Sequence, residues 1–395
     1  MQYRIDNRTG NKLSVLGFGC MRFPSSLGRV NKTKTEELIL NAINGGVNYF
    51  DTAYLYFGSE EAIGEILEKH NLRKTIYLAT KLPHSMCTSN TDFDMFFNEQ
   101  KKRLRTDYID YYFMHNFTDL EQWQRLCQLG IEEWISDKKR NEEIRQIGFS
   151  FHGSYDELVK LLDVYNWDFV QIQYNYLNEN YQAGIKGLRY AADKGLPVFI
   201  MEPLLGGKLV EIPREGLDIF KKANPDSTPV SWALNWIWNQ SEATVILSGM
   251  NEMSQLTENM NLAEESRPGM MTSSEQEVLH QVVGVLNKTY KIRCTGCNYC
   301  MPCPKKLNIP AYFAAYNSSY AIGWRTGVMQ YMLSVGITSN TPSFIGNCIQ
   351  CGLCEKKCPQ GIEIRKELKR VKRRLQIPCA KPVMSIASRF IKKRA

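Results

Sequence analysis

Apolar segments of strand length alternate with segments of helix length eight times within the first 260 or so residues. Apolar residues run almost without interruption inside each short segment, which is typical of parallel strands that are buried on both faces. A strand followed by a helix forms a right-handed unit that returns to the same sheet. The predicted strands are Val15–Gly19, Val47–Asp51, Ile76–Thr80, Ile109–Met114, Ile144–Phe151, Phe169–Tyr174, Pro197–Met201 and Thr244–Leu247.

Eight such units in about 250 residues match the size of a closed (β/α)8 TIM barrel, an α/β fold. A doubly wound open sheet is the alternative, but Gly17-Phe18-Gly19 does not complete a G-x-G-x-x-G motif, since position 22 is Arg. We therefore predict a barrel domain over residues 1–270 and a connecting helix over residues 271–290. Because no apolar run reaches the roughly 18–20 residues of a membrane span and the N-terminus is polar, we expect a cytoplasmic protein.

Eight of the twelve cysteines lie in two runs between Cys294 and Cys358. The second run fits the bacterial ferredoxin pattern C-x2-C-x2-C-x3-C-P at every position, whereas the first has two residues before its last cysteine. Both runs end in Cys-Pro, and the segment between them has two stretches with helical character. The expected metal ligands are Cys294, Cys297, Cys300, Cys303, Cys348, Cys351, Cys354 and Cys358.

These runs predict a small, mainly helical 4Fe-4S ferredoxin-type domain over residues 291–364. In ferredoxins with two clusters, the fourth cysteine of a run ligates the other cluster. By this analogy Cys358 would join the first three cysteines of the first run, and Cys303 the first three of the second run. Tetrahedral zinc is the alternative because four-cysteine zinc sites also use C-x2-C pairs, but repeated triplets followed by Cys-Pro favour two [4Fe-4S] clusters.

Ionisable side chains follow three successive strands of the predicted barrel, at the end where barrel enzymes carry out their chemistry. Asp51 ends the second strand, Tyr56 lies five residues further on, Lys81 follows the third strand and His115 follows the fourth. A lysine ammonium beside a tyrosine favours the phenolate, which makes Tyr56 a usable proton donor, and Asp51 would orient that lysine. His115 could hydrogen-bond a carbonyl oxygen, so we predict a four-residue catalytic site.

The first 260 or so residues resemble the aldo/keto reductase superfamily in the segment Asn48–Glu60, in Lys81 and in His115. The whole chain resembles the branch of that superfamily that is fused to a C-terminal, α-helical dicluster ferredoxin domain. The resemblance implies hydride transfer from a reduced nicotinamide to a carbonyl carbon, with Tyr56 protonating the oxygen. It also implies a small carbonyl or alcohol substrate.

The resemblance further implies a set of dinucleotide contacts. Ser150 and Gln171 would hold the carboxamide, with His152 substituting for an asparagine where this chain has Phe151. The remaining contacts would be Leu204, Gly206, Gly207 and Lys208 at the pyrophosphate, and Ser248, Gly249, Met250, Glu258 and Asn259 on the adenosine side. Gln255 replaces the expected arginine, so we predict NAD(H) or unselective binding rather than a preference for NADP(H).

The net charge of +8 is the sum of +11 in a tail over residues 365–395 and −3 in the other 364 residues. A basic helix there could simply expose its charged face to solvent. It could also bind an acidic redox partner such as ferredoxin or flavodoxin. Binding to nucleic acid or to an anionic membrane is the less favoured alternative. We assign no metal-binding or catalytic role to the other cysteines, which are Cys20, Cys87, Cys127 and Cys379.

The sequence thus predicts an iron-sulfur oxidoreductase of aldo/keto reductase type. Two alternatives are a reductase whose clusters are structural or sense oxygen, and a non-catalytic electron carrier or redox sensor whose barrel only binds a ligand. A catalytic metal held by His84, His115 and His152 with Asp51 is disfavoured, because no H-x-H ends the first strand.

Overall fold

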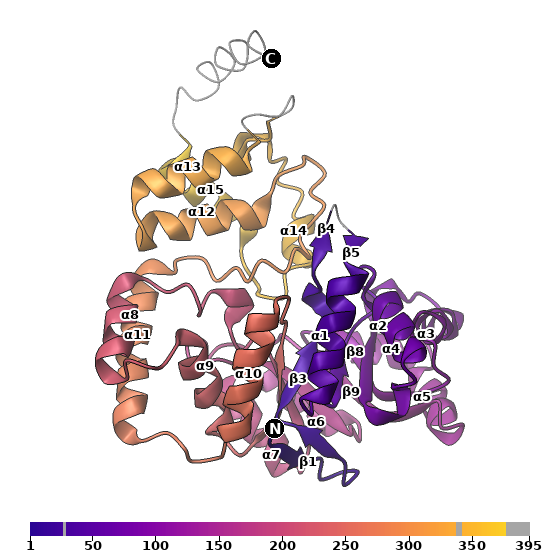
Figure 1. Cartoon of the computed structure of the whole chain (residues 1–395). Helices are drawn as coiled ribbons and strands as arrows, with labels where there is room; N and C mark the ends of the chain where they lie inside the picture. Colours follow the sequence, from indigo (N-terminus) through magenta and orange to yellow (C-terminus); the bar gives the residue numbers. More distant parts are fainter. Residues whose placement is uncertain (27–28, 337–341, 377–395) are drawn as a thin grey trace. The chain divides into compact units, whose positions relative to one another are not determined.

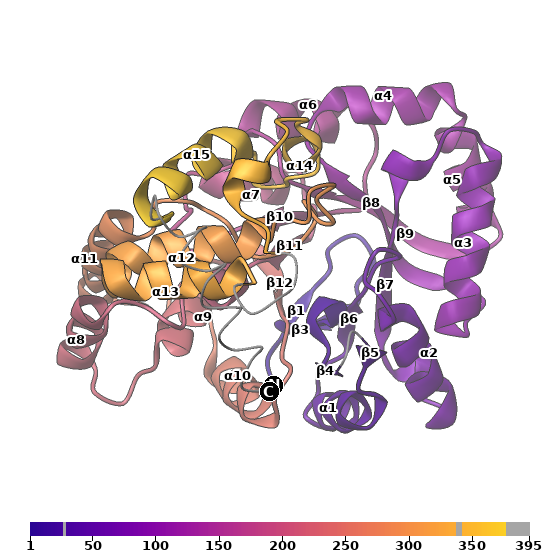
Figure 2. The same ribbon diagram turned by 90° about the horizontal axis from the view of Figure 1, so that it is seen from above.

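A computed structural model describes residues 1–26, 29–336 and 342–376 of the chain. Eight parallel strands form a closed barrel in the order β10-β11-β12-β3-β6-β7-β8-β9, which confirms the predicted (β/α)8 fold and excludes an open sheet (Figure 2). These strands are β3 (Leu16–Gly19), β6 (Tyr49–Asp51), β7 (Tyr77–Leu82), β8 (Ile109–Phe117), β9 (Ile144–Phe151), β10 (Phe169–Gln173), β11 (Val198–Met201) and β12 (Ala243–Ser248).

Three strands continue further than the sequence predicts: β12 by one residue, to Ser248, and β7 and β8 by two or three. Strand β7 continues to Leu82 and pairs Lys81 with Phe113, while β8 continues to Phe117 and pairs that residue with Phe151. Lys81 and His115 therefore lie within the last residues of their strands rather than in the loops that follow. Their side chains are held by strand backbone, which fixes them more firmly than a loop would.

Helices α1 to α7 lie outside the ring of strands (Figure 2). Side-chain caps begin several of them; for example, the side chain of Asn31 accepts from the backbone N–H of Lys34, and that of Ser154 from Glu157. The helices that follow the barrel strands in sequence are α1 (Lys32–Asn44), α2 (Ser59–Lys69), α3 (Thr91–Leu104), α4 (Leu120–Gln128), α5 (Ile131–Arg140), α6 (Tyr155–Val164), α7 (Gly184–Asp193), α8 (Arg214–Ala223), α9 (Pro229–Trp238) and α10 (Met253–Glu265).

Aromatic side chains fill the interior of the barrel. The ring centres of Tyr49 and Phe199 lie 4.8 Å apart, and those of Phe113 and Phe169 lie 4.6 Å apart. A Cβ atom on Gly148 would lie only 2.5 Å from the ring of Phe169, so that position has no room for a side chain. The lower barrel is a packed core rather than a channel.

An N-terminal hairpin of β1 (Tyr3–Ile5) and β2 (Lys12–Ser14) packs at the base of this core. Leu13 of the hairpin belongs to the same buried cluster as Tyr111, and the Tyr111 hydroxyl donates a 2.8 Å hydrogen bond to Asp6. The hairpin therefore closes the barrel at the N-terminal end of its strands. A second ribbon consists of β4 (Ser25–Ser26) and β5 (Arg29–Val30).

The chain divides into two compact units, and Figure 1 labels many of their helices and strands. The first comprises Met1–Leu204 and Val230–Gln276, and the second comprises Leu205–Pro229 and Glu277–Ala395. The remaining helices are α11 (Ser273–Thr289), where a connecting helix is predicted, α12 (Ile309–Ala321), α13 (Trp324–Ser334), α14 (Leu353–Lys356) and α15 (Ile364–Leu375). Within the described residues, no helix combines the length and the apolar character that crossing a membrane requires.

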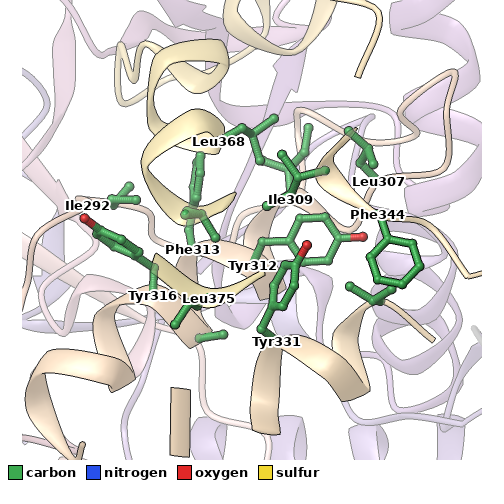
Figure 3. Close-up of a cluster of buried hydrophobic side chains, with 14 of the residues drawn as sticks. Ile292, Leu307, Ile309, Tyr312, Phe313, Tyr316, Tyr331, Phe344, Leu368 and Leu375 are labelled. Carbon is green, nitrogen blue, oxygen red and sulfur yellow. The ribbon is translucent and has the colours of Figure 1, made fainter. Parts of the chain in front are cut away.

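The helices α12, α13 and α15 share a hydrophobic core in the second unit (Figure 3). Tyr312 of α12 and Tyr331 of α13 contact edge to face with their ring centres 5.4 Å apart, and Leu368 of α15 belongs to the same buried cluster. Six of the clustered cysteines pack against this core as partly buried side chains. Helix α15 buries its apolar stripe and exposes its basic face; residues 377–395 of the predicted tail, including Cys379, lie outside the described residues.

Candidate functional site

A buried ion pair joins two neighbouring barrel strands at their C-terminal ends. The ammonium of Lys81, on β7, donates to the carboxylate of Asp51, on β6, and also to the carbonyl oxygen of Thr52 at 2.8 Å. Asp51 and Lys81 are only 3% and 1% exposed. Burial lowers the pKa of Lys81, and the facing carboxylate of Asp51 opposes that shift by favouring the charged ammonium.

Tyr56 and His115 complete the predicted group of four. The Nζ atom of Lys81 lies 5.2 Å from the ring centre of Tyr56. The rings of Tyr56 and His115 meet edge to face with their centres 5.9 Å apart. The structure thus brings together all four residues that the sequence places at strand ends.

Burial lowers the pKa of the three histidines at this end of the barrel, which favours their neutral forms. Burial, followed by the charge of Lys81, lowers the pKa of His115 well below its usual value. Burial also lowers the pKa of His84 to about 4, with a further contribution from Arg125, and that of His152 to about 4. A neutral imidazole at position 115 retains one ring N–H, with which it can donate a hydrogen bond to a carbonyl oxygen.

Two more side chains reach the ion pair without having been assigned to it from the sequence. The Nε2 atom of Gln171, on β10, donates a 3.0 Å hydrogen bond to Asp51. Cys20, which directly follows β3, is buried, and desolvation followed by the charge of Asp51 raises the pKa of its thiol well above the usual value. Cys20 has a signal in the sequence, its position directly after a strand, whereas Gln171 lies in the middle of β10 and meets Asp51 only through closure of the barrel.

The expected carboxamide contacts lie at the ends of β8 and β9. The hydroxyl oxygen of Ser150 accepts a 2.7 Å hydrogen bond from the backbone N–H of Asn116. Buried atoms nearby, Oδ1 of Asn116 and Nδ1 of His152, have no hydrogen-bond partner among the described residues. A polar planar group such as a carboxamide fits this donor and acceptor set, because it would satisfy atoms whose burial is otherwise costly.

The expected adenosine-side segment follows β12. The side-chain nitrogen of Asn259, on α10, donates a 3.0 Å hydrogen bond to the hydroxyl of Ser248, and both residues are buried. Met250 is buried and Glu258 is half-buried. A Cβ atom on Gly249 would lie 3.5 Å from the Cβ of Arg22, which belongs to the segment after β3. A cationic residue therefore borders this loop, and the sequence alone did not predict that proximity.

The expected pyrophosphate loop is divided between the two units. Leu204 ends the first stretch of the first unit, whereas Gly206, Gly207 and Lys208 belong to the second unit. Gly206 and Gly207 have φ values of 66° and 89°, a backbone conformation that favours glycine. Burial raises the pKa of the Cys294 thiol to about 11, and Lys208 lies near enough to oppose this shift.

The eight clustered cysteines line two hollows in the second unit. The first hollow is lined by Cys294, Cys297, Cys300 and Cys358, and the second by Cys303, Cys348, Cys351 and Cys354 together with Cys300. Each fourth cysteine, Cys303 or Cys358, therefore lies with the triplet of the other run. Within the described residues, no three His, Cys, Asp or Glu side chains are close enough to hold a single metal ion.

Comparisons with known proteins identify the family of each part of the chain. Residues 15–271 match the model of the aldo/keto reductase family, and residues 293–363 match that of the 4Fe-4S dicluster domain. L-galactose dehydrogenase from Arabidopsis thaliana is 25% identical over 313 residues, which cover 72% of this chain and 94% of that protein. Aldo-keto reductase YhdN from Bacillus subtilis is 25% identical over 297 residues, covering 65% and 87% of the two chains.

Among solved structures, aldo-keto reductase AKR11C1 from Bacillus halodurans in its holo form has a similar fold, with a TM-score of 0.59 at 23% identity. The similarity covers 71% of this chain and 96% of that chain. The family model spans more than half of the present sequence. This chain belongs to the aldo/keto reductase family, as an oxidoreductase with a C-terminal 4Fe-4S dicluster domain.

Proposed function

We propose that the barrel interconverts a small carbonyl compound and its alcohol with NAD(H) or NADP(H), and that the C-terminal domain carries single electrons on two [4Fe-4S] clusters. The convergence of Asp51, Lys81, Tyr56 and His115 at one end of the barrel carries the catalytic half of this proposal. The relative named L-galactose dehydrogenase supports chemistry between an alcohol and a carbonyl group.

Tyr56 is the proposed proton donor to the carbonyl oxygen. The ammonium of Lys81 near its ring favours the phenolate that remains after proton transfer, and Asp51 keeps that ammonium charged in a buried place. Neutral His115 donates a hydrogen bond to the same oxygen and stabilises the charge that develops there. A bound reduced nicotinamide supplies the hydride for the carbonyl carbon.

Ser150, His152 and Gln171 are the proposed carboxamide contacts, supported by the buried atoms at the ends of β8 and β9. The pyrophosphate contacts are Leu204, Gly206, Gly207 and Lys208, and the adenosine contacts are Ser248, Gly249, Met250, Glu258 and Asn259. No lysine or arginine occurs from Gly249 to Asn259, and Gln255 instead accepts a hydrogen bond from the backbone N–H of Asn251. NAD(H) or unselective binding stays the prediction, because a 2′-phosphate gains no cation from that segment.

The proposed cluster ligands follow the two hollows. One cluster takes Cys294, Cys297, Cys300 and Cys358, and the other takes Cys348, Cys351, Cys354 and Cys303. Four thiols around each of two separate hollows are the donor set that a [4Fe-4S] cluster requires, so the residues present fit the group. The clusters supply one-electron transfer when bound.

The substitution Tyr56→Phe tests the barrel chemistry, with Tyr54→Phe as the matched control. The ring of Tyr54 lies beneath Arg103 at 4.3 Å and contacts Phe96, so its hydroxyl has no place in the proposed reaction. We expect Tyr56→Phe to lower kcat in an anaerobic screen of aldehydes and ketones at least ~100-fold, as loss of a general acid does. Dinucleotide affinity should be unchanged, and the control should keep its activity. Equal carbonyl reduction by Tyr56→Phe and the native chain would refute the assignment and leave a barrel that only binds a ligand.

A further inference from the structure

The two cysteine-lined hollows differ in their surroundings. Apart from its cysteines, the first hollow is lined by uncharged side chains such as Thr295, Phe313 and Ile364. The second hollow is lined by three cationic side chains, Lys305, Lys357 and Arg365. The surroundings of the second hollow are therefore positively charged.

The second hollow also faces solvent. Cys351 is an exposed cysteine, whereas the other seven in the two runs are only partly exposed. Ile349 and Leu353 line the same hollow and are 56% and 48% exposed, although both are large apolar side chains. An exposed apolar pair beside an exposed cluster ligand is a surface that a partner could cover.

Cations exceed anions around this apolar pair. Arg365 is paired with Glu355 at 2.7 Å, which compensates part of its charge, but no ion pair is found for Lys305 or Lys357 among the described residues. Helix α15 adds further exposed cations; Glu363 and Glu367 pair with Lys366 and Arg370, while Lys369, Lys372 and Arg373 add to the excess. An apolar centre with a cationic rim is the composition of a small, transient interface for an acidic protein.

We propose that Ile349 and Leu353, with Lys305, Lys357 and Arg365 as a cationic rim, dock an acidic one-electron redox protein. The cluster held by Cys303, Cys348, Cys351 and Cys354 is then the point at which electrons enter and leave the chain. One electron passes from the reduced partner to this oxidised cluster, the partner is oxidised by one electron, and no bond forms or breaks. This inference rests on the proposed function, since it requires that cluster.

The test uses the full chain with reconstituted clusters and the double substitution Lys305→Glu/Lys357→Glu. Stopped-flow spectroscopy follows cluster reduction by a reduced, acidic plant-type [2Fe-2S] ferredoxin. At about 0.02 M salt we expect the second-order rate constant to fall at least ~10-fold, because opposite charge accelerates encounter. At about 0.5 M salt, where charges are screened, the native and substituted chains should react at similar rates.

Lys222→Glu/Lys288→Glu is the matched control with the same change in net charge, because Lys222 of α8 and Lys288 of α11 are exposed and do not line the hollow. It should slow reduction far less, and photoreduction by deazaflavin should be the same for all three chains. Two results would overturn the proposed docking surface: an equal loss of rate in the control and in the double variant, or rate constants that do not change with salt concentration.

A second measurement separates this inference from the presence of the cluster. Carbodiimide should link carboxylates of the same ferredoxin to Lys305 or Lys357 of the native chain, as mapped by mass spectrometry. Iron and sulfide counts, with EPR spectra of the reduced chain, read cluster content independently. If a chain with both clusters is cross-linked only at other lysines, the docking surface is wrong but the proposed function stands. If the chain never binds the cluster of Cys303, Cys348, Cys351 and Cys354, the proposed electron transfer is wrong.

Discussion

The side-chain amide of Gln171 donates a 3.0 Å hydrogen bond to Oδ2 of Asp51, from a strand that is not adjacent to the strand of Asp51. The other oxygen of the same carboxylate, Oδ1, accepts from Lys81. Asp51 is therefore fixed at both of its oxygens. Under the proposed mechanism Gln171 would act through Asp51, in addition to its proposed contact with the carboxamide.

Gln171→Leu separates these two roles. Loss of a hydrogen bond to a charged group costs about 1.5–3 kcal/mol, so we expect kcat to fall about 10-fold or more if the bond to Asp51 dominates. The dinucleotide Kd, measured by tryptophan fluorescence, should then change little. Gln146→Leu, near the start of β9, serves as the control. An unchanged kcat with a weakened dinucleotide Kd would instead leave the carboxamide contact as the principal role.

Lys81→Met leaves the carboxylate of Asp51 charged in a buried place. Removing one partner of a buried pair typically costs about 3–5 kcal/mol, so the free energy of unfolding of the barrel should fall by an amount of that order. Lys81→Met/Asp51→Asn should recover much of the loss, since no uncompensated charge is left, while both variants stay inactive. Urea unfolding followed by tryptophan fluorescence measures this. A double variant as unstable as the single one would show that the ion pair is not the source of the cost.

Pairs of cysteine substitutions distinguish the two possible ligand arrangements. Cys294 and Cys358 line the same hollow, so Cys294→Ser/Cys358→Ser should remove one cluster and leave about four of about eight irons. Cys294 and Cys303 line different hollows, so Cys294→Ser/Cys303→Ser should disturb both clusters and remove most of the iron. The opposite pattern would mean that each run ligates its own cluster. Iron and sulfide analysis after anaerobic reconstitution provides the counts.

Burial lowers the pKa of His84 to about 4 from its usual 6.5. As the pH falls below 6.5, the unfolded chain gains a proton that the folded chain does not, so the stability of the barrel decreases until the pH approaches 4. We expect a loss of about 1 kcal/mol from this residue between pH 7.5 and pH 5.5. His84→Gln should reduce that difference, whereas His280→Gln, at an exposed position of α11, should not. Urea midpoints that shift equally with pH in both variants would contradict the assignment to His84.

The eight strands could be predicted because each is buried on both faces, which leaves a continuous apolar run in the sequence. Their ends could not, since pairing such as that of Lys81 with Phe113 depends on the neighbouring strand. The positions of Asp51, Lys81 and His115 at strand ends predicted that these three residues belong to the site. These positions did not predict the bond from Gln171 to Asp51, because residues 120 positions apart meet only when the barrel closes. The spacing of the cysteines predicted two sets of four cluster ligands. Analogy with ferredoxins placed Cys303 and Cys358 each with the triplet of the other run, and the two hollows have the same grouping.

The aromatic side chains that fill the lower barrel, with Leu13 and the N-terminal hairpin beneath them, have a consequence for the ion pair above. Because close-packed rings fill the barrel below, we expect a proton exchanging with Lys81 or Asp51 to travel through the open end, where the proposed substrate would bind. Bound substrate would itself stop that exchange. Proton return to Tyr56 would then wait for the alcohol to leave, and the solvent isotope effect would report product release as well as the chemical step.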